Sequence, residues 1–270
     1  MIIHIVTSDF TLKAKSKRYV VSLNERDYEF PAMKTDCIIL NPYGSLTSGA
    51  VKLAEEYRTT IIFVDDDLKI MYLSFLDVDK DVKYLLGQIE SFLHRRDEYA
   101  RMFLRAAENA RKQLVKYLGL NFVGEGKFWR DEEKYIQCLE EVFGQEVRYM
   151  VNFARIRLIA ECLHFLLKAG LNPSLGFLHE GEASLARDLA LEFQYNVSDL
   201  AAVHVIKRGG DVKNLIQTYQ KRMEAGFTHP VLKRPITYRE AIRIQAKTLA
   251  ATMISLNIRY SPLKVRIQSS

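Results

Sequence analysis

The sequence predicts an α+β protein with a small β-rich N-terminal domain and a larger all-helical C-terminal domain. Two observations predict this division. Up to about residue 76, short segments rich in β-branched and aromatic residues alternate with turn residues, as strands do. From about residue 81, apolar residues recur every three or four positions, as on one face of a helix. We therefore expect a β-rich domain over residues 1–76, a linker over 77–83 and a helical domain over 84–270.

The first domain is expected to hold strands over residues 2–6, 18–23, 35–41, 59–64 and 69–75. Turn residues such as Asn24-Glu25 separate them. One helix interrupts the strands, since Thr47 or Ser48 can cap it and apolar residues come after them at helical spacing. The last two strands leave an edge and an apolar face that a small domain can hardly cover, which predicts a homodimer through this domain.

The second domain begins with two apolar stripes at helical spacing, one from Leu85 to Leu93 and one from Tyr99 to Leu118. Glycine and proline residues divide the remainder of the domain. Further helices are expected over residues 131–169, 184–195, 198–207, 212–224 and 237–256. Ser184 stands where an N-cap would open its helix.

Composition excludes several classes of protein. No apolar run approaches the roughly 18–20 residues that span a bilayer, and the first residues do not resemble a signal peptide. The three cysteines, Cys37, Cys138 and Cys162, are far apart and have neither zinc-binding nor disulfide-framework spacing. A reducing cytoplasm is the expected location. The formal charge of +6 permits a polyanionic partner without requiring one.

One segment of the helical domain could carry chemistry. A proline-containing turn delivers His179, and Ser184, Asp188 and Glu192 then recur at every fourth position, on one face of the expected helix. A histidine beside two carboxylates suits a divalent metal ion. The same residues are also compatible with a solvated helix face and a hydrogen-bonded loop histidine, so spacing alone leaves both interpretations open.

This segment resembles the signature of the CRISPR-associated integrase family, often called Cas-one. The matching residues are Gly170-Leu171-Asn172-Pro173, Gly176-Phe177-Leu178-His179, Ser184-Leu185 and Asp188-Leu189. Residues 35–75 resemble the strand–helix–strand unit of the family's β-domain, and residues 238–266 resemble its final helix and tail. Nearly the whole chain is covered by the resemblance.

The resemblance implies a metal site and names its ligands. The family holds one metal ion with a Glu, the motif His and an acid three residues after the motif Asp. His179 and Asp188 match as they stand, and Glu146 is the best match for the Glu. The third ligand position falls on Leu191, so Glu192 is the expected substitute. The resemblance thus implies His179, Glu146 and Asp188 as catalytic residues and adds Glu192 to the metal ligands.

The implied activity is integration of spacer DNA, in which a 3′-hydroxyl attacks a phosphodiester. A Mg²⁺ or Mn²⁺ ion would suit oxygen ligands with one imidazole and would stabilise charge in this transfer. The implied partners are duplex or branched DNA, a second copy of the chain and the family's small adaptation subunit. The alternative is a DNA-binding or scaffolding subunit that has lost full metal ligation, which Leu191 and the short interval from Glu146 to His179 favour.

Basic residues come after the motif helix and could track phosphates. Arg148 and Arg187 lie beside candidate ligands and could instead pair with their carboxylates. The predicted DNA-binding residues are Arg148, Arg187, Lys207, Arg208, Lys213, Lys233, Arg234, Arg239, Arg243 and Lys247.

Overall fold

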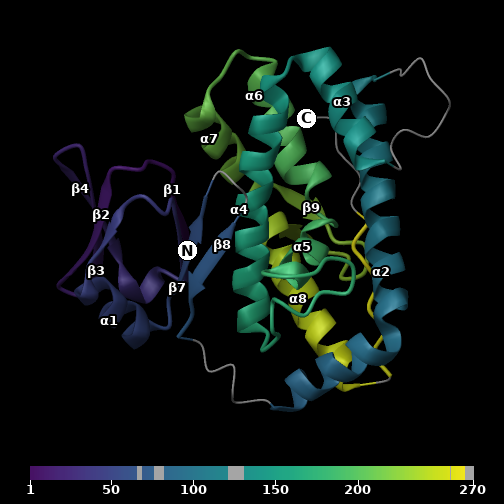
Figure 1. The fold of residues 1–270 in the computed structure, drawn as a ribbon, viewed down its shortest axis with the longest axis horizontal. Helices are drawn as coiled ribbons and strands as arrows, with labels where there is room; N and C mark the ends of the chain where they lie inside the picture. The colour runs from purple at the N-terminus through teal and green to yellow at the C-terminus, as the bar shows by residue number, and fades with distance from the viewer. Residues whose placement is uncertain (66–68, 76–81, 121–130, 256, 265–270) are drawn as a thin grey trace. The chain divides into compact units, whose positions relative to one another are not determined.

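The computed structural model describes residues 1–65, 69–75, 82–120, 131–255 and 257–264. It confirms the α+β class: strands dominate the N-terminal part and helices dominate the rest (Figure 1). The chain divides into two compact units, Met1–Asp81 and Val82–Ser270. Most of the expected linker, residues 77–81, lies outside the described residues.

The first sheet of the N-terminal unit consists of β1 (Ile2–Ile5), β5 (Cys37–Leu40), β7 (Thr60–Val64) and β8 (Ile70–Leu73), in that order. The first three strands are parallel, and β8 is antiparallel to β7. Each of the four was expected from its β-branched and apolar residues, and the sequence placed them within a few residues. All four residues of strand β5 are buried, so the strand is covered on both faces. A strand in that position needs apolar residues throughout, and Cys37–Leu40 supplies them.

The second sheet has the order β4-β3-β2-β6. It consists of β2 (Phe10–Lys15), β3 (Arg18–Leu23), β4 (Arg26–Pro31) and β6 (Ser45–Leu46). Of these only β3 was expected. Strand β4 was missed because its first four residues are exposed, so it lacks the apolar alternation that marks a half-buried strand.

Two tight turns join the strands of this second sheet. Ser16 and Lys17 link β2 to β3, and Asn24 and Glu25 link β3 to β4; all four have positive φ angles between 45° and 61°. Two-residue loops of this kind match the twist of the strands they connect. Helix α1 (Ser48–Tyr57) comes next after β6, and the side chain of Thr47 accepts a hydrogen bond from Ala50 N, as an N-cap does.

The C-terminal unit is built around one buried helix. Its elements are α2 (Val82–Leu118), α3 (Glu132–Phe143), α4 (Glu146–Lys168), α5 (Ser184–Ala190), α6 (Leu200–Ile206), α7 (Val212–Met223), β9 (Gly226–Thr228), β10 (Pro235–Thr237) and α8 (Tyr238–Ile254). Helix α4 lies among the other helices and contacts α3, α5, α6, α7 and α8 (Figure 1). Most of its side chains are buried, on every face of the helix. A helix apolar all round is a core helix.

Three expectations for this unit were wrong in detail, and one hairpin was missed. The helix expected over 131–169 is two helices, because Gly144 adopts a φ of 91° that ends the first. The helix expected over 184–195 ends at Ala190, and residues 195–199 form a π-helical turn. The N-cap position of α5 is Ala183 rather than Ser184. The hairpin of β9 and β10 was not expected.

Among the described residues, no helix combines the length and apolarity needed to cross a membrane.

Candidate functional site

The motif loop between α4 and α5 is organised by one buried carboxylate. Asp188 Oδ2 accepts hydrogen bonds from the backbone N–H groups of Phe177 (2.6 Å) and Leu178 (3.0 Å). Asp188 Oδ1 accepts one from His179 N (3.0 Å) and lies 2.7 Å from Nδ1 of the His179 ring. The Asp188 side chain is fully buried. Both of its oxygens are therefore used to fix the loop and the histidine.

Close packing explains the glycine in this loop. A Cβ atom at Gly176 would lie 2.7 Å from Cβ of Ser184, so only glycine fits. The Gly176 N–H donates to Oγ of Ser184 (2.9 Å), and Leu185 N donates to the Pro173 carbonyl (2.8 Å). Ser184 therefore binds the loop from inside the helix rather than capping it.

Helix α2 holds the same loop from the other side. The buried amide of Gln88 donates to the carbonyls of Asn172 (2.8 Å) and Leu175 (3.2 Å) and accepts from Asn172 N (2.9 Å). Further along the same helix, Arg96 donates to the Phe177 carbonyl (3.0 Å) and pairs with Glu180 (2.7 Å). The loop is thus anchored at both ends of its apolar stretch.

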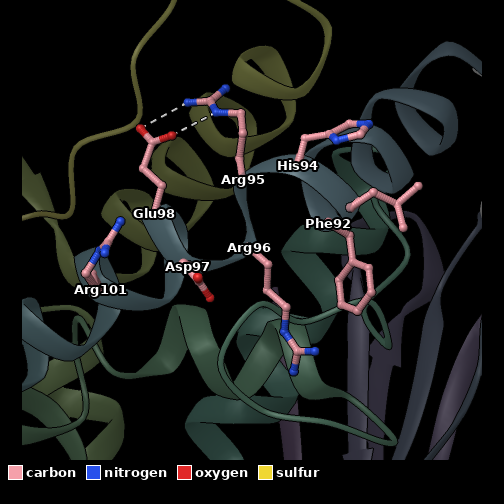
Figure 2. A pocket seen from close by; sticks show the side chains of 8 residues that line it. Phe92, His94, Arg95, Arg96, Asp97, Glu98 and Arg101 are labelled. Atoms are coloured by element: carbon pink, nitrogen blue, oxygen red, sulfur yellow. Dashed lines mark hydrogen bonds and ion pairs between the residues drawn. The ribbon is translucent and has the colours of Figure 1, made fainter.

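The surface of α2 beside this loop carries a pocket lined by charged side chains (Figure 2). Arg95 forms a two-bond pair with Glu98, at 2.9 and 3.2 Å, while Arg96 extends in a different direction toward the motif loop (Figure 2). Sequence reasoning missed Arg96, because its partners lie more than 80 residues away along the chain. No local pattern marks such a contact.

The ring of His179 is oriented but accessible. Its side chain is 40% exposed, and its Nδ1 atom is held by Asp188. Among the described residues no hydrogen-bond partner of the Nε2 atom is found. A carboxylate behind the ring and a free second nitrogen is the usual arrangement of a metal-binding or proton-transferring histidine.

Glu192 serves a different part of the fold. It is buried, and its oxygens accept hydrogen bonds from Gln245 Nε2 (2.7 Å), from Leu263 N (2.7 Å) and from the hydroxyl of Tyr260. Burial raises the pKa of the Glu192 carboxyl to about 7, although these hydrogen bonds oppose the rise. Glu192 therefore ties the chain after α5 to α8 and to the C-terminal segment.

Glu146 is separated from the motif loop by a whole helix. It is the exposed first residue of α4, whereas the motif loop begins after Lys168 at the other end. A helix of 23 residues is about 34 Å long. Leu191, the residue after α5, is half-buried. The structure brings His179 and Asp188 together, and does not bring Glu146 or Glu192 to them.

Other buried carboxylates in this unit are paired with arginines. Glu161 in the middle of α4 binds Arg239 through two bonds of 2.8 and 3.1 Å. Asp199 binds Arg155 in the same way, at 2.8 and 2.6 Å. These pairs join residues that are 78 and 44 positions apart in the chain. Two-bond pairing with arginine satisfies a buried carboxylate and leaves it unsuited to bind a cation.

The predicted DNA-binding residues fall into two groups. Arg148 is paired with Glu133 and Glu140, Arg239 with Glu161, and Arg234 with Glu240, so these arginines already have partners. Arg187 is half-buried, and Arg243 lies 3.5 Å from Glu240. The exposed residues that form no ion pair among the described residues are Lys207, Arg208, Lys213, Lys233 and Lys247.

Comparisons with known proteins agree with this fold and motif. A family model described as CRISPR associated protein Cas1 matches residues 144–224, which include α4, the motif loop and α5. A Cas1 endonuclease of Clostridium perfringens is 20% identical over 69% of this chain and 66% of its own length. A second, from Thermus thermophilus, is 28% identical over 43% of this chain. The chain is thus similar to Cas1 proteins, most clearly over residues 144–224.

Solved structures show the same fold. A casposase bound to integration product superposes with a TM-score of 0.79 at 16% identity, covering 99% of this chain and 94% of that one. A Cas1 protein from Thermotoga maritima gives a TM-score of 0.69 at 14% identity, covering 94% and 97%. The match spans 42% of the length of the Thermus endonuclease.

The metal centre implied by the Cas1 signature does not fit the side chains of this chain. Throughout the described ranges, no group of three or more His, Cys, Asp and Glu residues is placed to hold a metal ion. Asp188 uses both oxygens on the motif loop, Glu192 uses both on α8 and the tail, and Leu191 offers no ligand atom. Of the predicted ligands, all of which are described, His179 keeps Nε2 available, and Glu146 lies at the far end of α4 from the motif loop.

Proposed function

We propose that the protein is a DNA-binding subunit of the CRISPR adaptation machinery that has lost the metal centre of its Cas1 relatives. The observation that carries the proposal is the use of the two motif carboxylates, Asp188 and Glu192, as internal hydrogen-bond acceptors. Four donors occupy all the lone-pair sites of Asp188, and three donors occupy all but one of those of Glu192, so little acceptor capacity is left for a cation. In this proposal the fold is retained and the ligand set is lost.

Charge distribution supports the DNA-binding part of the proposal. Residues 207–247 contain ten Lys and Arg against three Asp and Glu, a formal charge of +7 in a chain of +6 overall. The net positive charge is therefore concentrated in the segment from the end of α6 through α7 and the β9–β10 hairpin to α8. Five of these residues, Lys207, Arg208, Lys213, Lys233 and Lys247, are exposed and form no ion pair with a described residue. Exposed basic charge of this kind is the electrostatic footprint of a phosphate-binding surface. Solved relatives include a Cas1–DNA complex and a casposase bound to an integration product.

The relatives also suggest its partners. One matching structure is a Cas6–RT–Cas1–Cas2 complex, which superposes with a TM-score of 0.72 over the whole of this chain. We propose that this chain, too, binds a small adaptation subunit, and that it forms a homodimer through its N-terminal unit. Strand β8 supports the second point, since it is the edge of its sheet and exposes Met71, Tyr72 and Leu73.

Affinity for duplex or branched DNA is expected to fall by about 10³-fold between about 50 and 200 mM salt, as about six phosphate contacts would require. Fluorescence anisotropy across a salt series measures it. Changing Lys207, Lys213 and Lys247 together to glutamine should reduce the slope of log affinity against log salt by about three.

The matched control replaces three lysines of the N-terminal unit, Lys13, Lys15 and Lys17, with glutamine. These changes remove the same charge outside the basic segment and should leave the slope unchanged. A flat salt titration, or no binding at low salt, would contradict the proposed function.

The second candidate is a metal-dependent integrase and endonuclease that uses Mg²⁺ or Mn²⁺. The exposed, carboxylate-oriented ring of His179 favours it, as does the naming of several relatives as Cas1 endonucleases. Within the described residues the chain supplies one available ligand nitrogen at His179 but no group of three side chains placed to hold a metal ion. A metal ion at His179 would therefore need further ligands from DNA phosphates or from a partner protein.

We expect no strand joining by the native chain in an integration assay with branched DNA, whether Mg²⁺, Mn²⁺ or chelator is present. Leu191→Glu should not create activity either, because one new carboxylate does not replace both Glu146 and the occupied Asp188. Joining that needs metal and disappears in His179→Ala would establish the second candidate. The same assay with an active Cas1 relative shows that the substrate is competent.

A further inference from the structure

The hairpin of β9 and β10 ends in a tip, residues 230–233, that exposes two apolar side chains. Val231 is 78% exposed and Leu232 is 45% exposed, although one side chain of each hairpin strand is buried at the base. Phe227 and Ile236 form that base, and the Phe227 ring packs 4.8 Å from the ring of Tyr238. The exposed apolar groups are therefore carried on a firmly packed support.

Hydrogen bonds hold the tip in one conformation. The buried ring of His229 accepts hydrogen bonds at Nδ1 from the N–H groups of Val231 (3.2 Å) and Leu232 (3.1 Å). The backbone closes around it, with His229 N donating to the Arg234 carbonyl and Lys233 N to that of His229, each at 2.9 Å. Burial and the nearby Arg234 lower the pKa of His229, which keeps Nδ1 an acceptor at neutral pH.

Positive charge surrounds the tip. Lys233 is exposed, has a φ of 53° and forms no ion pair with any described residue. At the base of the hairpin, Arg234 and Arg243 share the single carboxylate of Glu240, at 2.7 and 3.5 Å. The tip also lies within the segment of charge +7, residues 207–247. An apolar tip beside basic residues is complementary to duplex DNA, in which charged phosphates enclose stacked, largely apolar base faces.

We propose that this tip is a wedge that inserts Val231 and Leu232 between stacked bases of bound duplex DNA. The proposal rests on the proposed DNA-binding function. Proteins that unstack DNA do so with a few apolar side chains flanked by basic residues that contact phosphates. A tip already fixed by His229 loses little conformational entropy when it inserts, so more of the contact energy is available to separate the bases.

The size of the apolar surface favours DNA over a protein partner. A stable protein interface involves about 20–30 residues on each side. The tip offers two apolar residues beside a lysine, which is too little for such an interface. Two side chains are sufficient to separate one base step, which costs a few kcal/mol. The wedge also leaves the phosphate contacts of the basic segment unchanged.

The experiment measures 2-aminopurine fluorescence in a set of short branched duplexes that together place the probe at every position around the branch. Unstacking of the probe raises its emission. Saturating native protein should raise the emission at least about 2-fold at one or two adjacent positions. The double variant Val231→Ser with Leu232→Ser should abolish this rise while keeping the salt slope of binding.

The matched control is Val142→Ser, which removes a side chain that is 55% exposed on α3. It should behave as the native protein does. Equal thermal midpoints confirm that all variants fold, as expected for exposed positions. DNA binding by the native protein without any fluorescence rise would overturn the wedge and leave the proposed function intact. No DNA binding at low salt would overturn both.

A last arm replaces DNA with vesicles of phosphatidylserine and phosphatidylcholine, since an apolar tip beside lysines can also enter a membrane surface. The native protein should not sediment with them. Sedimentation that is lost in the double variant would assign the tip to a lipid surface and overturn the proposal.

Discussion

Replacing Asp188 with alanine is expected to lower the free energy of unfolding by about 3–5 kcal/mol. The substitution removes the acceptor for Phe177 N, Leu178 N, His179 N and the His179 ring at once. Donors left unpaired in a buried site cost more than the bonds themselves contribute. Domains of this kind are stabilised by about 5–15 kcal/mol in total, so the loss is large. Urea unfolding followed by circular dichroism measures it.

Glu182→Ala is the control for this change, since Glu182 lies in the same loop, is exposed and forms no hydrogen bond with a described residue. It should alter the free energy of unfolding by less than about 0.5 kcal/mol. A cost below about 1 kcal/mol for Asp188→Ala would contradict the assignment of this carboxylate to the loop. It would then be free to act as a metal ligand.

Strands and helices with a clear pattern of apolar residues were predictable from the sequence. Strands β1, β5, β7 and β8 are rich in β-branched and apolar residues, and α2 has regular apolar stripes. Strand β4 was not predictable in this way, because most of its side chains face solvent and its pairing with β3 is fixed by a two-residue turn. Its position depends on tight-turn geometry, which residue types indicate only weakly.

The pairing of His179 with Asp188 was also predictable, because the two residues are only nine apart and belong to one motif. The position of Glu192 was not. Spacing of four residues places side chains on one face only while the helix continues, and α5 ends at Ala190. The turns and the π-helical segment that come after it redirect the chain, so Glu192 meets Gln245 and Tyr260 instead.

Long-range ion pairs limited the prediction of DNA-binding residues. The sequence around Arg239 gives no sign of an ion-pair partner, but in the structure Arg239 binds Glu161, which precedes it by 78 positions. Arg148 likewise meets Glu133 and Glu140 of the preceding helix. Charge that is paired inside the fold does not attract phosphate, and only the packing of α4 against its neighbours reveals which charges are paired.

Replacing Glu192 with glutamine is expected to stabilise the protein at pH 8 and to leave it nearly unchanged at pH 5. The pKa of Glu192 is about 7 in the folded protein and 4.5 ordinarily. Between these values the folded chain keeps a proton that the unfolded chain releases, so stability falls as pH rises through this window. The difference corresponds to about 3 kcal/mol above pH 7.

A glutamine can reproduce the contacts without the charge. Its carbonyl oxygen can accept from Gln245 and from Leu263 N, and its amide can donate to the Tyr260 hydroxyl, which then reverses its role. Urea unfolding at pH 5 and pH 8 should therefore show a contribution of about 3 kcal/mol in the native chain that is absent in Glu192→Gln. Glu180→Gln, at an exposed position, should keep the native pH dependence.

A loss of stability at both pH values in Glu192→Gln would contradict this account, because it would show that the charge itself is stabilising. The result also bears on function. A carboxyl group that is half protonated near pH 7 and is held by three donors from α8 and the tail is poorly suited to bind Mg²⁺ or Mn²⁺. If the glutamine variant is the more stable at pH 8 and binds DNA as the native chain does, Glu192 is a structural residue, and the DNA-binding function does not depend on it.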